Sequence, residues 1–140
     1  MNATCGKAYF GRRVVLSASH RLHSEALSLE ENRAAYGKCN NPHGHGHNYV
    51  VEVLVGGQVD PATGMVVNLA ALDEVVRKRV LERFDHTDLN LDPLFLNQVP
   101  TTENFCKAVF DLLKDAMPVG ELEYVRVEET ENNFFEYYGQ

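Results

Sequence analysis

Histidines are the most informative residues in this chain, because three of its six stand at alternate positions, His43, His45 and His47. In an extended strand, residues two apart point to the same side, so these imidazoles would face one way. Gly44 and Gly46 leave the opposite side bare, where another backbone can approach closely. Neutral imidazole is a good zinc ligand, and the stretch therefore predicts a metal site.

A further ligand can come from His20, at the end of a predicted strand over residues 9–20. A second predicted strand, residues 47–55, alternates apolar and polar side chains from its first residue. If the two strands pair antiparallel, the end of the first lies beside the start of the second, and His20 meets His45 and His47. Three histidines with an open fourth position are the arrangement of catalytic zinc.

Spacing alone leaves other readings of these histidines open. A single histidine at the end of an apolar row is more often a core residue, which applies to His20. His23 and His43 compete as ligands, and Cys39, six residues before His45, is near enough to share the site.

Two carboxylates also stand where they could do chemistry. Asp85 precedes His86, and an adjacent carboxylate can tune an imidazole for proton transfer. Glu129 ends an apolar row, where an unpaired charge is costly unless a ligand receives it or the row has reached solvent.

The elements that must position these residues follow from hydrophobic periodicity and capping signals. Helices are expected over 69–84 and from Thr101 to about residue 116, with a short capped helix that begins after Ser28 and ends at Gly37. Further strands are expected over 121–130 and 134–138. The order predicts an α+β domain in which two helices cover one face of a four-stranded antiparallel sheet (ββααββ). Its uncovered edges invite assembly between copies.

Length and charge narrow the function classes. We expect one domain over residues 1–140, with a flexible N-terminal segment over residues 1–12. The formal net charge of −7 argues against a nucleic-acid partner or an anionic membrane. Three cysteines without framework spacing, and no apolar leader or membrane-length segment, favour a cytoplasmic protein.

Six motifs in order along the chain resemble the 6-pyruvoyltetrahydropterin synthase family: SASHRLH (17–23), GKCNNP (37–42), GHGHNY (44–49), DPATGM (60–65), TTEN (101–104) and ETENN (129–133). The resemblance implies the tunnelling fold, in which trimers close a twelve-stranded barrel and stack as a homohexamer. It also implies a lyase of tetrahydrobiopterin biosynthesis that converts 7,8-dihydroneopterin triphosphate into 6-pyruvoyltetrahydropterin and releases triphosphate.

The same resemblance assigns roles to individual residues. The family's zinc ligands fall on His20, His45 and His47, one zinc for each chain, and magnesium is expected with the triphosphate. Its proton-abstracting cysteine falls on Cys39, and its Asp–His pair on Asp85 and His86, which would serve a neighbouring subunit. The remaining substrate-binding positions are Thr101, Thr102, Glu103 and the pterin-anchoring Glu129.

Two other functions compete with this one. The related 6-carboxytetrahydropterin synthases of queuosine biosynthesis share the fold, metal and substrate, but carry their cysteine closer to the His-Gly-His motif. Five residues intervene here between Cys39 and His45, which favours the pyruvoyl enzyme. A non-catalytic, zinc-stabilised binding module would have no use for Cys39 or the Asp85–His86 pair.

Overall fold

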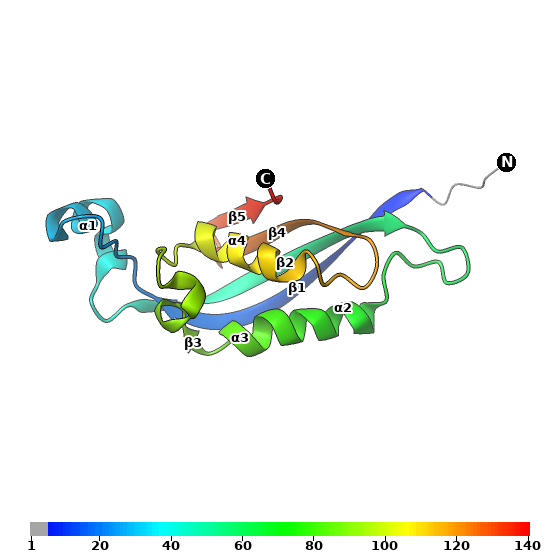
Figure 1. The fold of residues 1–140 in the computed structure, drawn as a ribbon, viewed down its shortest axis with the longest axis horizontal. Helices are drawn as coiled ribbons and strands as arrows, with labels where there is room; N and C mark the ends of the chain where they lie inside the picture. Colours follow the sequence, from blue (N-terminus) through cyan, green and yellow to red (C-terminus); the bar gives the residue numbers. More distant parts are fainter. Residues whose placement is uncertain (1–5) are drawn as a thin grey trace.

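Two long antiparallel strands, β1 (Lys7–His20) and β2 (His45–Gln58), form the centre of the fold (Figure 1). The computed structural model describes residues 6–140. Strand β4 (Glu121–Thr130) pairs antiparallel with β2, and β5 (Asn133–Tyr137) pairs antiparallel with β4. The short β3 (Thr87–Asp88) runs parallel to β1, which gives the order β3-β1-β2-β4-β5.

The expected four-stranded antiparallel sheet is therefore wrong in one respect: the sheet has five strands and is mixed. β3 has only two residues, too few to produce the alternation by which a strand is recognised in sequence. It is placed by tertiary contacts instead, since the His86 amide donates to the Ser17 carbonyl over 2.6 Å. The α+β class and the other four strands are confirmed.

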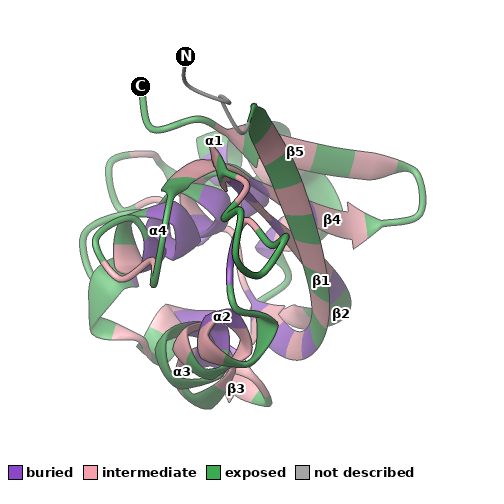
Figure 2. Ribbon diagram, turned by 90° about the vertical axis from the view of Figure 1, so that its right-hand side faces the viewer, coloured by how far each residue is buried: buried purple, intermediate pink, exposed green. Residues whose placement is uncertain are grey.

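Two helical segments cover one face of the sheet, as the sequence predicts (Figure 2). The first is continuous through α2 (Leu69–Val76), a π-helical turn (Arg77–Leu81) and α3 (Glu82–Phe84), and the Asn68 side chain caps its start. The second is α4 (Thr102–Leu113), capped by the Thr101 hydroxyl. Each cap satisfies a backbone N–H that the first helical turn leaves without a partner.

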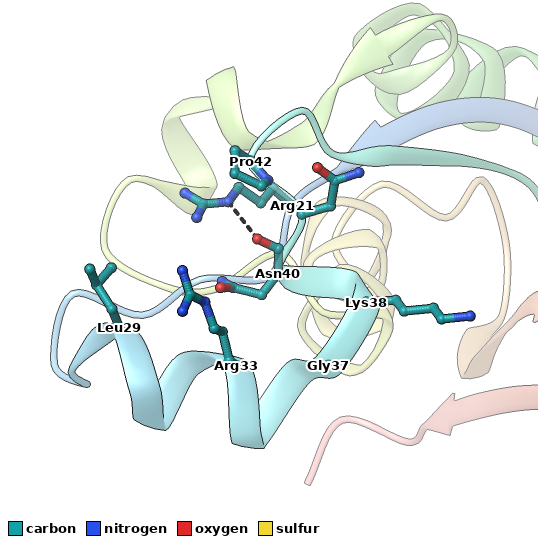
Figure 3. A pocket seen from close by; sticks show the side chains of 8 residues that line it. Arg21, Leu29, Arg33, Gly37, Lys38, Asn40 and Pro42 are labelled. Carbon is teal, nitrogen blue, oxygen red and sulfur yellow. Dashed lines mark hydrogen bonds between the residues drawn. The ribbon is translucent and has the colours of Figure 1, made fainter.

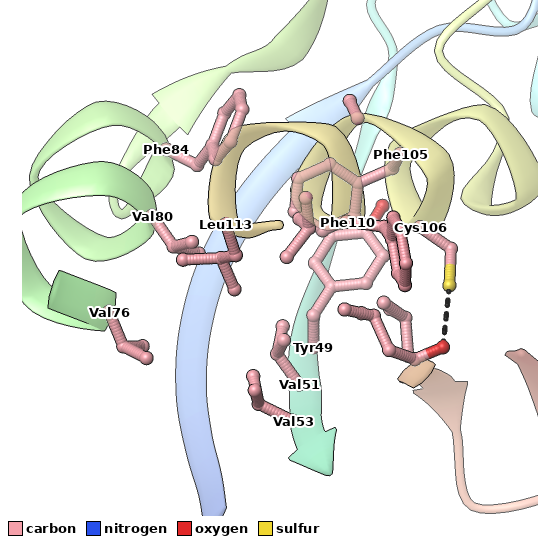
Figure 4. Close-up of a cluster of buried hydrophobic side chains, with 14 of the residues drawn as sticks. Tyr49, Val51, Val53, Val76, Val80, Phe84, Phe105, Cys106, Phe110 and Leu113 are labelled. Atoms are coloured by element: carbon pink, nitrogen blue, oxygen red, sulfur yellow. Dashed lines mark hydrogen bonds between the residues drawn. The ribbon is translucent and has the colours of Figure 1, made fainter. Parts of the chain in front are cut away.

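The core lies between this face and the helices (Figure 4). Alternate residues of β2 are fully buried, and side chains of α2, α3 and α4 pack on them. The largest fully buried apolar side chains are Tyr49, Phe84, Phe105, Leu16, Leu72, Leu89 and Leu113. This buried layer holds the inward face of β1 and β2 in place, including the positions of the histidines at their ends.

A short helix, α1 (Leu29–Tyr36), projects at the end of the molecule opposite the N-terminal end of β1 (Figure 1). Ser28 and Glu31 form the predicted capping box at its start. A 3₁₀ turn, Gly37–Asn40, leads from α1 back to the sheet, and two more 3₁₀ turns, Leu89–Leu91 and Pro93–Phe95, follow β3. The segment that contains α1 and the Gly37–Asn40 turn thus leads back to His45, the first residue of β2.

The N-terminal segment is more ordered than the sequence suggests. Residues 7–12, which we expected to be flexible, form the first part of β1, where each pairs with a residue of β2. Residues 1–5, with Cys5, lie outside the described part of the chain. No helix among the described residues is long and apolar enough to cross a membrane.

Candidate active site

Three imidazoles meet where β1 ends and β2 begins. The register places His20 opposite His45 and Ala18 opposite His47, so the predicted antiparallel pairing brings the three together. Their ring centroids lie 4.5 Å (His20–His45), 5.1 Å (His20–His47) and 4.7 Å (His45–His47) apart. One ligand atom of each lies within 4.8 Å of the others, and this is the one such group of metal-ligating side chains within residues 6–140.

The hydrogen bonds of His20 prepare it to bind a cation. Its Nδ1 lies 2.8 Å from the Pro100 carbonyl oxygen, which can only accept, so Nδ1 carries the proton and Nε2 keeps a lone pair. That Nε2 lies 2.9 Å from the Nε2 of His45, so a proton or a cation must lie between them. The Nε2 of His47 is buried without a hydrogen-bond partner among the described residues. The three side chains could therefore hold a metal ion.

Burial favours the neutral form of His20 and His47. His20 is 1% exposed, and burial lowers its pKa below the ordinary value, with His45 and His47 adding to the effect. Burial likewise lowers the pKa of His47. A neutral imidazole offers its lone pair to a metal at neutral pH, whereas a protonated one cannot.

Gly44 makes the approach of the two strands possible. Its φ is 71°, a region that favours glycine, and a Cβ there would lie 3.0 Å from the carbonyl oxygen of His20. A Cβ at Gly46 would lie at an ordinary 3.5 Å from the Ala18 carbonyl. The expected close backbone approach therefore requires glycine at position 44 but leaves room for a Cβ at position 46.

Glu129 sits beside the histidines rather than in solvent. Its Oε2 lies 3.7 Å from the Nε2 of His47 and 3.8 Å from that of His20. It accepts hydrogen bonds from the Thr102 hydroxyl and, at Oε1 over 3.2 Å, from the Asn133 amide. Burial raises the pKa of Glu129, but these hydrogen bonds and the two histidines outweigh it, so the pKa lies below the ordinary value. The group is therefore a carboxylate, and the solvent-exposed alternative for this residue is wrong.

The other expected substrate-binding positions lie at the start of α4. Thr102 is buried and holds Glu129, as described above. Thr101 uses its hydroxyl to accept the Asn104 amide over 3.2 Å, which makes it a helix cap. Glu103 is exposed in the first helical turn. Of the three, Thr102 has the direct link to the centre.

Cys39 lies on the 3₁₀ turn that precedes β2 and is half-buried. Its carbonyl accepts the amide of Leu22 over 2.9 Å, and Leu22 lies two residues after His20. The adjacent Asn40 amide donates to the Leu22 carbonyl over 2.8 Å and lies 3.0 Å from the Nδ1 of His23. This cross-bonded pair of segments, 21–23 and 39–40, ties Cys39 to the end of β1. His23 is occupied by Asn40 and is not part of the three-histidine group.

Asp85 and His86 contact β1 at the edge that does not pair with β2. Asp85 Oδ1 accepts the Ser17 amide over 2.9 Å and lies 3.0 Å from the Nδ1 of His86. His86 has a φ of 62°, the one positive value at a non-glycine position within residues 6–140, and its side chain is 81% exposed. A hollow of about 490 Å³ beside it is lined by both strands, including Ser17, Asn48 and also His47 of the three-histidine group. Among the described residues, no hydrogen bond or ion pair joins the pair to the three histidines.

Three groups that support the site were not identified from the sequence. The Pro100 carbonyl holds His20 across eighty positions of the chain, and a backbone group has no sequence signature. Asn133 supports Glu129, and Asn40 supports Cys39. Both asparagines lie inside the quoted motifs ETENN and GKCNNP, which could have drawn attention to them.

The fold and the site together define an α+β protein with a three-histidine centre able to hold a metal. The family model described as 6-pyruvoyl tetrahydropterin synthase matches residues 10–140. The chain belongs to the 6-pyruvoyl tetrahydropterin synthase family.

Individual relatives agree with this assignment. The human protein named 6-pyruvoyl tetrahydrobiopterin synthase is 50% identical over 135 residues, which cover 96% of this chain and 93% of that protein. The solved structure of Caenorhabditis elegans 6-pyruvoyl tetrahydropterin synthase has a TM-score of 0.93 and 43% identity, covering 98% of this chain and 99% of that one. An Archaeoglobus fulgidus protein named putative 6-carboxy-5,6,7,8-tetrahydropterin synthase is 34% identical over 114 residues, 81% of this chain and 90% of that protein.

Proposed function

We propose that the chain is a zinc-dependent 6-pyruvoyl tetrahydropterin synthase. It converts 7,8-dihydroneopterin triphosphate into 6-pyruvoyltetrahydropterin and eliminates triphosphate. No external oxidant is needed, because the two electrons lost by the side-chain alcohol reduce the dihydropterin ring. The family membership supports the reaction, and one observation carries the site: His20 and His45 present Nε2 atoms 2.9 Å apart while Pro100 holds the other nitrogen of His20.

His20, His45 and His47 would hold the zinc and leave a fourth position for substrate oxygens. When bound, the zinc supplies Lewis acidity that makes a C–H next to a coordinated side-chain oxygen easier to deprotonate. Magnesium would accompany the triphosphate. No second group of metal-ligating side chains occurs in the described residues.

Cys39 is the proposed base. Its Sγ, as the thiolate, would take the proton from the substrate side chain, since the thiolate is the reactive form of cysteine. The bonds that join Cys39 and Asn40 to Leu22 keep the thiol at a set distance from the end of β1, where His20 lies. Cys39 does not join the metal-ligating group, which fits a base better than a ligand.

Glu129 would anchor the pterin ring. A carboxylate can accept two N–H bonds from an amino-pyrimidinone edge, a charge-assisted contact that fixes the ring's orientation. Thr102 and Asn133 hold that carboxylate in place and keep it ionised. Thr101 and Glu103 would contribute from the start of α4.

Asp85 and His86 would act in a neighbouring copy of the chain. An imidazole that is 81% exposed and, among the described residues, has no hydrogen bond to its own three histidines needs a partner surface to become part of a closed site. The outer strands β3 and β5 each leave one edge unpaired, through which copies can join. We infer a homohexamer, a dimer of trimers, and light scattering that gives a monomer mass at micromolar concentration would contradict it.

The product decides between the proposed function and its alternatives. Zinc-loaded protein is incubated with 7,8-dihydroneopterin triphosphate and magnesium, and the pterin product is identified by mass spectrometry. We expect 6-pyruvoyltetrahydropterin and one triphosphate for each turnover. A 6-carboxytetrahydropterin product would indicate the queuosine-type enzyme, and binding without turnover would indicate a zinc-stabilised module.

A further inference from the structure

A basic hollow lies beside the end of β1, and the proposed chemistry above does not use it. It has a volume of about 550 Å³ and is lined by Arg21, Leu29, Arg33, Gly37, Lys38, Asn40, Asn41 and Pro42. No carboxylate is among these residues, although the chain carries a net charge of −7. The hollow is therefore a local reversal of the protein's charge, which favours an anion.

Most basic side chains elsewhere in the chain are paired with carboxylates, whereas those of this hollow are not. Of the thirteen lysines and arginines, all within the described residues, eight form ion pairs with carboxylates. Three of the five without such a pair, Arg21, Arg33 and Lys38, line this one hollow. Like charges held close together without a counter-ion repel each other, and a bound anion would relieve that repulsion.

Arg21 and Arg33 are the two side chains placed to bind it. Arg21 Nε donates to the Asn40 carbonyl over 3.2 Å, which fixes the direction of its guanidinium. Figure 3 shows the guanidinium groups of Arg21 and Arg33 on the same side of Asn40, whereas the Lys38 side chain extends away from them. Two planar guanidinium groups on one side suit phosphate oxygens, which arginine can bind in a bidentate manner.

The hollow lies next to the end of β1 that carries His20. A smaller hollow of about 270 Å³ shares Arg21 and Pro42 with it and is also lined by His20, His43 and the carboxylate Asp88. Arg21 is itself the next residue after His20, and Asn90 holds its backbone through both the amide (2.7 Å) and the carbonyl (2.9 Å). An anion bound by Arg21 would therefore lie on the segment that directly follows His20.

We propose that Arg21 and Arg33 form the binding site for the polyphosphate chain of the substrate. This inference rests on the proposed function, because a pterin bound at the histidines with a triphosphate tail would place that tail at the adjacent basic hollow. The same site would retain free triphosphate after elimination and make it a competitive product inhibitor.

The test compares tripolyphosphate binding by zinc-loaded wild-type protein and by variants, using calorimetry. Arg33→Gln is the main variant, since Arg33 is exposed on α1 and glutamine has a similar helix propensity. We expect its affinity to fall about tenfold, as for the loss of one charge-assisted contact, and to fall further in Arg33→Glu. Arg21→Lys keeps the charge but loses the planar fork, and it should also weaken binding. Lys38→Gln should have a smaller effect.

Three controls establish whether the loss of affinity belongs to this hollow. Arg79→Gln removes another unpaired arginine, on the π-helical turn beside α2, and should bind tripolyphosphate like wild type. Zinc content is measured after each titration, because tripolyphosphate can bind zinc directly. Binding of 7,8-dihydroneopterin, which lacks phosphates, should be equal in all variants.

The outcomes distinguish the two proposals. If the wild type turns over the triphosphate substrate but Arg33→Gln and Arg21→Lys match Arg79→Gln in tripolyphosphate affinity and KM, the hollow is not the polyphosphate site. If tripolyphosphate binding depends on these arginines but no pterin product forms, the anion site stands and the proposed function fails. Binding that follows the zinc content alone would also overturn the inference.

Discussion

Replacing Asn40 by alanine tests whether the bonds between segments 21–23 and 39–40 position the proposed base. Asn40 is 7% exposed, and its amide donates to the Leu22 carbonyl over 2.8 Å and lies 3.0 Å from His23 Nδ1. Alanine leaves the part-buried Leu22 carbonyl without this donor, which costs about 1–3 kcal/mol in the free energy of unfolding. His23 is half-buried and can turn toward water, so we count no further loss for it.

The effect on catalysis should exceed the effect on binding. Cys39 precedes Asn40 directly, and a displacement of about 1 Å at a reacting group can cost on the order of a hundredfold in rate. We therefore expect kcat to fall about 10- to 100-fold in Asn40→Ala, with KM and zinc content near those of wild type. The Cys39 alkylation rate, followed by peptide mass spectrometry, should also change, which loss of stability alone would not cause.

The matched control is Asn41→Ala, one residue further on. Asn41 is exposed, and its side chain accepts only the His43 amide, over 3.2 Å. Its unfolding free energy should change by less than about 0.5 kcal/mol, the usual range for surface substitutions. If Asn40→Ala keeps wild-type kcat, or if it loses zinc in step with activity, the positioning role is refuted.

Four further outcomes are expected. His45→Ala should lose its zinc by elemental analysis while His43→Ala retains it; the reverse would reassign the ligands. Cys39→Ala should keep zinc and bind pterin, but turnover should fall about 10²–10⁴-fold, the range for a general base; near-normal turnover would place the base elsewhere. Glu129→Gln should raise KM by about tenfold or more, because one charge-assisted bond is lost and the amide N–H₂ faces the pterin's donors; an unchanged KM would remove its anchoring role. Burial raises the pKa of the Cys106 thiol from 9.0 to about 12. The unfolded chain therefore loses this proton at lower pH than the folded chain, and the free energy of unfolding falls as the pH rises between these two values. In denaturant titrations Cys106→Ala should show a shallower decline over this range, and a decline equal to that of wild type would contradict the assignment.

The sequence alone determined much of the sheet and the three-histidine centre. Alternation at period two over 47–55 requires every second residue to face the core, and Tyr49, Val51, Val53 and Val55 do so. Antiparallel pairing then requires the end of one strand to meet the start of the next, which brings His20 opposite His45. These are local and pairwise consequences of backbone geometry, so they can be read from a single chain.

Tertiary structure alone decided how the remaining groups are placed. β3 joins the sheet by pairing with Ala18 and Ser19 of β1, and no pattern in its two residues indicates a parallel pairing. The positive φ of His86 occurs where Asp85 and His86 both bond the backbone of Ser17.

Long-range contacts also decided which nitrogen of His20 carries the proton and where Arg33 lies. The Pro100 carbonyl fixes the proton of His20 across eighty residues, and the excursion through α1 brings Arg33 beside Arg21. Such contacts depend on how distant segments fold back on one another, because closing long loops has an entropy cost that only the whole core offsets. Local periodicity in the sequence therefore cannot predict these contacts.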